Sequence, residues 1–163
     1  MGRSNVPCDF VGSSVAASSS GSALRPVDAP GALRTMPGGR AAWLWRGTVY
    51  ISYGGPGGLG VSRPQPWSQD GVGVPGSSER DDLSGFALAS ANYARSVRDG
   101  LAIGAAGESG NLERGMWEVG RVTVVYGRAG GLSSIHAQAW SQRSPGVSGT
   151  AEAWDRVGST ITP

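Results

Sequence analysis

The chain has 163 residues, with 28 glycines, ten prolines and a formal net charge of +2. This length suits one domain, and the glycine and proline content predicts many turns and little helix. The basic residues are all arginines scattered singly, which excludes the basic stripe of a nucleic-acid-binding protein. Cys8 is the only cysteine and His136 the only histidine, which excludes an intramolecular disulfide and a zinc site built from cysteine and histidine.

The first 42 residues are rich in serine, glycine and proline and contain few large apolar side chains. Such a segment buries too little apolar surface to offset its ordering entropy, so we expect a disordered tail over residues 1–42. Its apolar stretch is too polar for a convincing signal peptide, and no part of the chain approaches the roughly 20 apolar residues of a membrane-spanning helix.

Strand patterns begin after residue 43. Residues 48–53 are β-branched or aromatic and are followed by a glycine-rich turn and a return segment around Trp67. Pro64 and Pro66 favour an edge position for that return strand. Residues 86–91 and 101–105 are two further short strand candidates, followed by a polar connection.

Residues 47–85 recur without a gap at 120–158, at a constant offset of 73. Identical pairs include Gly47/Gly120, Tyr53/Tyr126, Gln65/Gln138, Trp67/Trp140, Glu79/Glu152, Asp82/Asp155 and Gly85/Gly158. Self-similarity at a fixed period is typical of repeat architectures, in which each unit buries its apolar face against the next. We therefore expect the two segments to follow the same strand–turn–strand path.

Several of these segments resemble motifs of one family. Asp155-Arg-Val-Gly158 resembles the opening DRFG motif of an FG-GAP repeat, Leu101–Ala106 its LAIGAP segment, and Gly120–Gly127 its GxVxVxYG strand. FG-GAP repeats are the blades of integrin-α-like β-propellers. The resemblance implies an all-β chain forming a partial β-propeller: a partial blade over 43–84, a full four-stranded blade over 85–158, and the start of another at 159–163.

The family's blades commonly hold calcium in a loop between the first two strands, and the matching stretch here is 92–100. Asn92, Ser96 and Asp99 are the ligand candidates. Ala94 and Gly100 occupy ligand positions without a side-chain oxygen, whereas calcium needs six to eight oxygen ligands. The loop is degenerate, and we expect no cofactor.

Other candidate sites are weak. His136 lacks an identifiable catalytic partner, and the recurring Glu79/Asp82 pair is expected to serve a turn, because catalytic residues seldom recur in each repeat. Trp67 and Trp140 either pack between neighbouring blades or form a binding surface. Trp117 and Trp154, which have no counterpart in the other copy, are weaker candidates for surface recognition.

The resemblance implies a non-catalytic, adhesion-like binding scaffold at the cell surface or outside the cell, with a protein or carbohydrate ligand. Other blades or other copies of the chain are expected partners, because a partial propeller leaves sheet faces and edges uncovered. Two alternatives stay open. The chain is a degenerate remnant without independent function, or it is the accessory propeller module of a secreted hydrolase.

The degenerate loop predicts that calcium does not stabilise the protein. A ligand present at about 100 times its dissociation constant adds about 2.7 kcal/mol to the free energy of unfolding. We expect no rise in melting temperature with millimolar calcium, measured by calorimetry. A clear rise that Asn92→Ala abolishes would show a working site.

Overall fold

The computed structural model describes residues 46–55, 58–59, 65–95, 98–110 and 117–162, together with the backbone of four short strands before residue 43. These residues form an all-β structure of antiparallel sheets and contain no helix. The described part accordingly includes no helix long and apolar enough to cross a membrane.

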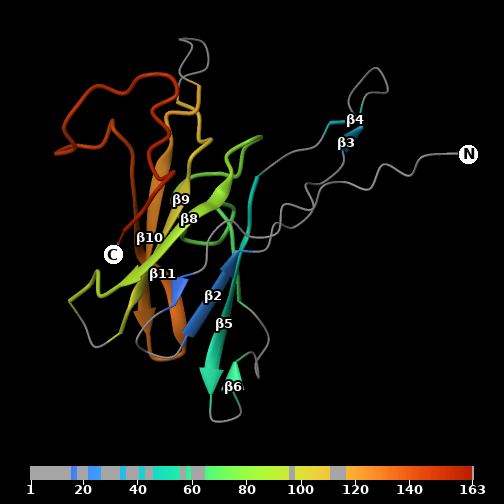
Figure 1. Cartoon of the computed structure of the whole chain (residues 1–163), viewed down its shortest axis with the longest axis vertical. Helices are drawn as coiled ribbons and strands as arrows, with labels where there is room; N and C mark the ends of the chain where they lie inside the picture. Colours follow the sequence, from blue (N-terminus) through green and yellow to red (C-terminus); the bar gives the residue numbers. More distant parts are fainter. Residues whose placement is uncertain are drawn as a thin grey trace, which may run out of the picture.

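The second half of the chain folds into a four-stranded sheet, as predicted for the full blade. Its strands are β8 (Ser84–Ala91), β9 (Gly100–Ala105), β10 (Arg121–Arg128) and β11 (Gly131–Trp140). Each strand pairs antiparallel with its neighbour in the chain, giving the meander β11-β10-β9-β8 (Figure 1). We call this sheet the second sheet.

The first half forms a sheet with more strands than the sequence predicted. It comprises β1 (Ala16–Ala17), β2 (Ser22–Pro26), β5 (Val49–Gly55) and β7 (Gln65–Trp67), with β6 (Gly58–Leu59) forming a small hairpin on β5. Strand β2 pairs with β5, and β7 pairs with β5 on its other side. This is the first sheet; β3 (Arg34–Thr35) and β4 (Ala41–Ala42) pair only with each other.

The two sheets share strand order and register. Across the first sheet, the paired positions run Ala16–Leu24–Ile51–Gln65. Across the second sheet, they run Ala89–Ala102–Val124–Gln138. Because Ile51 and Val124 are counterparts at the offset of 73, as are Gln65 and Gln138, the first sheet is a second copy of the same four-stranded unit.

Strands β1 to β4 lie within the range for which the sequence predicts a disordered tail. At these positions the chain pairs with other strands, β2 with β5 in particular. The remaining residues of 1–42 lie outside the described residues, so for them the disordered tail stays a prediction.

For the described parts of the two copies, the predicted superposition is confirmed at the level of single hydrogen bonds. The amide of Ser84 donates to the carbonyl of Arg46 at 3.0 Å, and at the matching place Val157 donates to Val119 at 3.0 Å. The hydroxyl of Tyr53 donates to Gln65 Oε1 at 2.6 Å, and that of Tyr126 donates to Gln138 Oε1 at 2.6 Å.

The acidic pair that recurs in both copies closes a turn, as expected. Asp82 Oδ2 accepts the amide of Glu79 at 2.5 Å, and Asp155 Oδ2 accepts the amide of Glu152 at 2.6 Å. A carboxylate that caps a backbone amide three residues earlier stabilises the turn locally. These residues therefore have a structural role in both copies.

The core lies where the two sheets face each other. The first sheet contributes Val49, Ile51 and Trp67, all buried. From the second sheet come Leu88, Leu101, Ile103 and Val125. Burying such a side chain contributes about 1.5–3 kcal/mol, so this interface is the main source of stability in the described part.

Glycine is required where the two segments of each copy meet. Gly47 has a φ of +83°, and a Cβ there would overlap the backbone of Ser84. Its counterpart Gly120 has a φ of +78° and lies equally close to Val157. Gly146 shares the conformation, with a φ of +84°, but has open space around it.

We predict that Gly47→Ala destabilises the protein far more than Gly146→Ala. Gly146→Ala loses only the free energy that a residue with a Cβ needs to adopt the left-handed conformation, about 1–2 kcal/mol. Gly47→Ala adds a backbone overlap that separates β5 from the turn before β8. Urea unfolding of both variants checks this, and equal losses would show that the close approach at Gly47 is unimportant.

Candidate functional site

The predicted calcium loop connects β8 to β9, the position that the resemblance implies. Asn92 is exposed at its start, Asp99 is half-buried at its end, and Ser96 lies outside the described residues. Within the described residues, no group of three or more histidine, cysteine, aspartate or glutamate side chains is placed to hold a metal ion. The loop instead packs its backbone near Asp99 against Gly127 of β10.

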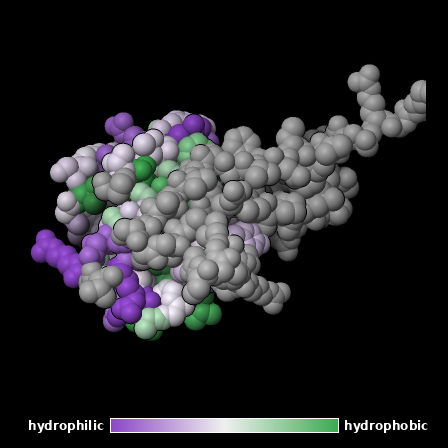
Figure 2. All heavy atoms as spheres, turned by 60° about the horizontal axis from the view of Figure 1, so that its bottom comes forward, coloured by the Kyte–Doolittle hydropathy of each residue, from purple (hydrophilic) through white to green (hydrophobic). Residues whose placement is uncertain are grey.

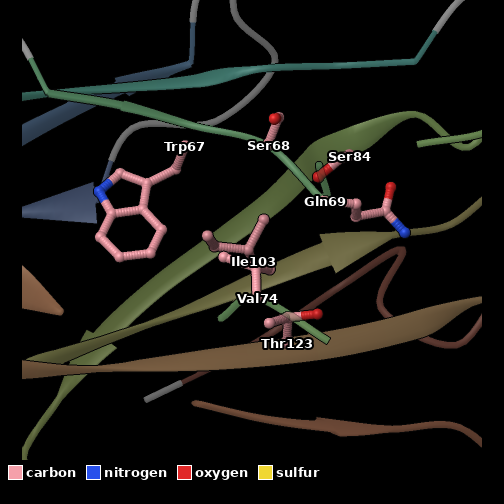
Figure 3. Close-up of a pocket in the computed structure, with 7 residues that line it drawn as sticks. All are labelled: Trp67, Ser68, Gln69, Val74, Ser84, Ile103 and Thr123. Atoms are coloured by element: carbon pink, nitrogen blue, oxygen red, sulfur yellow. The ribbon is translucent and has the colours of Figure 1, made fainter. Parts of the chain in front are cut away.

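The two recurring tryptophans have different environments. Trp67 is 8% exposed and lies between the sheets, where Ile103 of β9 and Thr123 of β10 line the same small cavity (Figure 3). Trp140, on β11, is half-buried. Of the two, only Trp140 is accessible to a ligand.

The structure brings together the two tryptophans that have no repeat counterpart. Residues 117–120 and 154–157 run parallel and side by side: the amide of Trp154 donates to the carbonyl of Trp117 at 2.9 Å, and Gly120 bridges Val157. The Trp117 and Trp154 side chains are 48% and 60% exposed. We call this pair the tryptophan platform.

Two charged residues, Arg156 and Glu118, lie next to the tryptophan platform. The guanidinium of Arg156 lies 6.0 Å from the centre of the Trp154 ring, within the range of a cation–π contact. Arg156 also forms an ion pair with Glu118, which neighbours Trp117, and its Nε donates to Glu118 Oε2 at 2.6 Å. These contacts join the side chains of the two segments.

The fold does not require the platform. In the other copy the matching positions hold Leu44 and Asp81. Asp81 nevertheless adopts the same backbone conformation as Trp154, with φ values of 65° and 73°. Exposed tryptophans without a packing role are suited to stack on sugar rings or on the side chains of a protein partner.

Exposed apolar residues elsewhere are dispersed. In the face shown in Figure 2, hydrophobic and hydrophilic residues of the described part alternate in small patches. Scattered single apolar side chains are normal on protein surfaces.

A second polar feature is buried near the sheet interface. Gln69 Nε2 donates to Glu108 Oε2 at 2.6 Å, and Glu108 Oε1 forms an ion pair with Arg121 Nη2 at 2.9 Å. Asp82 lies close enough to interact electrostatically with Glu108, Glu79 and Arg121. Its second carboxylate oxygen, Oδ1, is buried without a hydrogen-bond partner in the described part.

Burial determines how these carboxyl groups titrate. Desolvation raises the pKa of Asp82 from 3.8 to about 7, and the hydrogen bond from Glu79 opposes that shift only in part. Desolvation likewise raises the pKa of Glu108, although Arg121 and Gln69 favour its charged form. This cluster could not be predicted from the repeat, because Asp155 shares the Glu-x-x-Asp-x-x-Gly pattern of Asp82 but is exposed.

An open pocket of about 410 Å³ lies at one end of the second sheet. Its lining includes Tyr93, Tyr126, His136 and Gln138. His136 is exposed with a φ of 62°, and no hydrogen bond in the described part joins it to a carboxylate. This arrangement does not form the base-and-orienting-acid pair of a catalytic histidine.

No protein-family model matches the chain, and no curated protein matches it either.

The raised pKa of Asp82 predicts a stability that falls as pH rises. The folded state holds the proton between about pH 4 and 7, whereas unfolded Asp82 releases it near 3.8. The stabilisation is therefore complete below pH 4 and lost as the pH approaches 7. We expect Asp82→Asn to flatten this decline in urea unfolding measured across that range.

Asp155→Asn is the matched control, since Asp155 caps the same turn in an exposed setting. The control should keep the decline of the parent protein. Glu108 adds a smaller decline of the same sign in every variant. An unchanged profile for Asp82→Asn would contradict the assignment.

Proposed function

We propose that the chain is a non-catalytic binding module of the FG-GAP, integrin-α-like propeller type, acting at the cell surface or outside the cell. The tryptophan platform is its recognition surface, and a protein or a carbohydrate is its ligand. The observation that carries the proposal is the presence of two adjacent exposed tryptophans at positions where the other copy has Leu44 and Asp81.

The duplicated sheet supports a scaffold role. The turns and sheet-end hydrogen bonds are the same in both copies, so the repeated part of each unit serves the fold. Binding residues are commonly placed on loops held by a rigid scaffold. Trp117 and Trp154 follow this pattern because they lie outside the strands and differ between the copies.

The resemblance to FG-GAP repeats is supported by where its motifs lie. The LAIGAP-like segment falls on β9 and the GxVxVxYG-like segment on β10, two adjacent strands of the second sheet. The DRFG-like segment at 155–158 follows the return strand and pairs back to residues 118–120. An accessory module of a secreted hydrolase would use the same surface to hold a polysaccharide, so this alternative predicts the same binding residues.

The test is binding of the purified chain to two sets of probes, a glycan array and immobilised collagen and fibronectin. We expect binding to at least one set, and Trp154→Ala and Trp117→Ala to weaken it by about tenfold or more, as for buried aromatic anchors of interfaces. Val72→Ala is the control, because Val72 is 95% exposed in the first copy. No binding to either set, or binding that both tryptophan variants retain, would overturn the proposal.

A further inference from the structure

The end of the first sheet is closed by a cycle of three hydrogen bonds that reaches into the second sheet. Tyr53 OH donates to Gln65 Oε1 at 2.6 Å. The amide of Leu132, at the β10–β11 turn, donates to Tyr53 OH at 2.7 Å, and Gln65 Nε2 donates to the carbonyl of Leu132 at 3.1 Å. We call this arrangement the closed clasp.

The second sheet carries the same clasp without an occupant. Tyr126 OH donates to Gln138 Oε1 at 2.6 Å, as in the closed clasp. Both residues line the open pocket of about 410 Å³. No backbone segment of the described part fills the place that Leu132 takes at the first sheet, so we call this pair the open clasp.

The outer side of the second sheet, beside the open clasp, is only partly covered. Several residues of the first copy are buried against the second sheet. Their counterparts in the second copy lie on the outer side of the second sheet and are more exposed. The pairs that show this are Val49/Val122, Gln65/Gln138, Trp67/Trp140, Gln69/Gln142 and Asp82/Asp155. Ile51 and Val124 are buried in both copies. The outer face of the second sheet thus has the residues of an inter-sheet interface, and no sheet of the described part packs against it.

The chain also contains the segment that fits the open clasp. Leu59 is the counterpart of Leu132, and it pairs with Gly54 just as Leu132 pairs with Gly127. The closed clasp uses only the backbone amide and carbonyl of its leucine. The hairpin at Gly58–Leu59 can therefore present the same two groups to Tyr126 and Gln138 of another molecule.

Strand β5, next to the Leu59 hairpin, has a side chain that fits the outer face of the second sheet. Thr123 and Trp67 line the same small cavity in the existing interface (Figure 3), and the residue at the position of Thr123 in the first sheet is Tyr50, which is half-buried. Docking in the same geometry would place Tyr50 of one molecule near Trp140 of the next. An aromatic pair is a favourable contact for a sheet interface.

From these matches we infer that the chain associates head to tail with a second copy of itself. The first sheet of one molecule covers the outer face of the second sheet of the other, and the Leu59 hairpin closes the open clasp. The contact uses different surfaces on the two partners, so it closes into a ring when the rotation allows. With two sheets per molecule and propellers of four to eight blades, a ring needs about two to four copies.

The test is sedimentation velocity of the 163-residue chain over a range of concentrations, with two matched variants. Tyr126→Phe removes the hydroxyl of the open clasp, and we expect association about fivefold weaker or more. The melting temperature of the single molecule should fall less than in Tyr53→Phe, because Tyr126 OH makes one hydrogen bond there and Tyr53 OH makes two. Tyr53→Phe removes the same hydroxyl from the closed clasp. It should lower the melting temperature and leave the association constant nearly unchanged.

A stronger variant adds a steric and electrostatic block. Trp140→Asp should leave the chain monomeric, and circular dichroism reports whether its sheets remain folded. A parent chain that stays monomeric at all concentrations would overturn the inference, as would association that Tyr126→Phe and a folded Trp140→Asp both leave intact. The latter outcome would place the contact on another surface, including the tryptophan platform.

Discussion

Each sheet of this repeat has apolar side chains on a face that is suited to pack against another sheet. The packing of Val49, Ile51 and Trp67 against the second sheet is the interaction on which the described structure depends. It aligns the two copies so that the Leu132 backbone reaches Tyr53 and Gln65. The same packing buries Gln69 and Asp82. Their counterparts in the second copy, Gln142 and Asp155, are not buried.

Burial at this interface has an electrostatic cost. A charge removed from water is disfavoured unless it is paired. Within the described part, the Asp82 carboxylate accepts one hydrogen bond, from the Glu79 amide to Oδ2, and its Oδ1 has no partner. Arg121 pairs with Glu108 but leaves Nη1 without a partner in the described part. Protonation of Asp82 reduces this cost, which links the sheet interface to pH. Asp155 closes the same kind of turn, but it is exposed, so its charge does not have this desolvation cost.

The strands of the second sheet could be predicted because their alternation and their glycine turns are local properties. The expected strands at 86–91, 101–105 and 121–126 lie within β8, β9 and β10. Strands β1 and β2 were missed because the gap-free repeat does not extend through them. Ala16 and Ala89 differ by 73, but Leu24 and Ala102 differ by 78 at the same place in the ladder. The loop between the first two strands is therefore five residues shorter in the first copy, and this shift conceals the repeat.

A trace of the missing copy was nevertheless present in the sequence. Asp9 and Gly12 stand 73 residues before Asp82 and Gly85, which in turn stand 73 before Asp155 and Gly158. Two residues at the right spacing carry little weight in a segment rich in serine and small residues, where the strand propensity is low. Composition favoured disorder there, and the pairing of β2 with β5 was a tertiary effect that local sequence does not encode.

The tryptophans show most clearly what sequence alone leaves open. Trp67 and Trp140 hold the same repeat position, yet Trp67 is buried and Trp140 half-buried, because among the described strands a second sheet packs against Trp67 alone. Trp117 and Trp154 are 37 residues apart in the chain (154 − 117) and become neighbours only through the parallel pairing of their segments. Repeat position thus predicts what a residue can contact, whereas the number of units beside it decides whether that contact is made. Residues that break the repeat are released from this packing requirement, which is why Trp117 and Trp154 are exposed although Trp67 is buried.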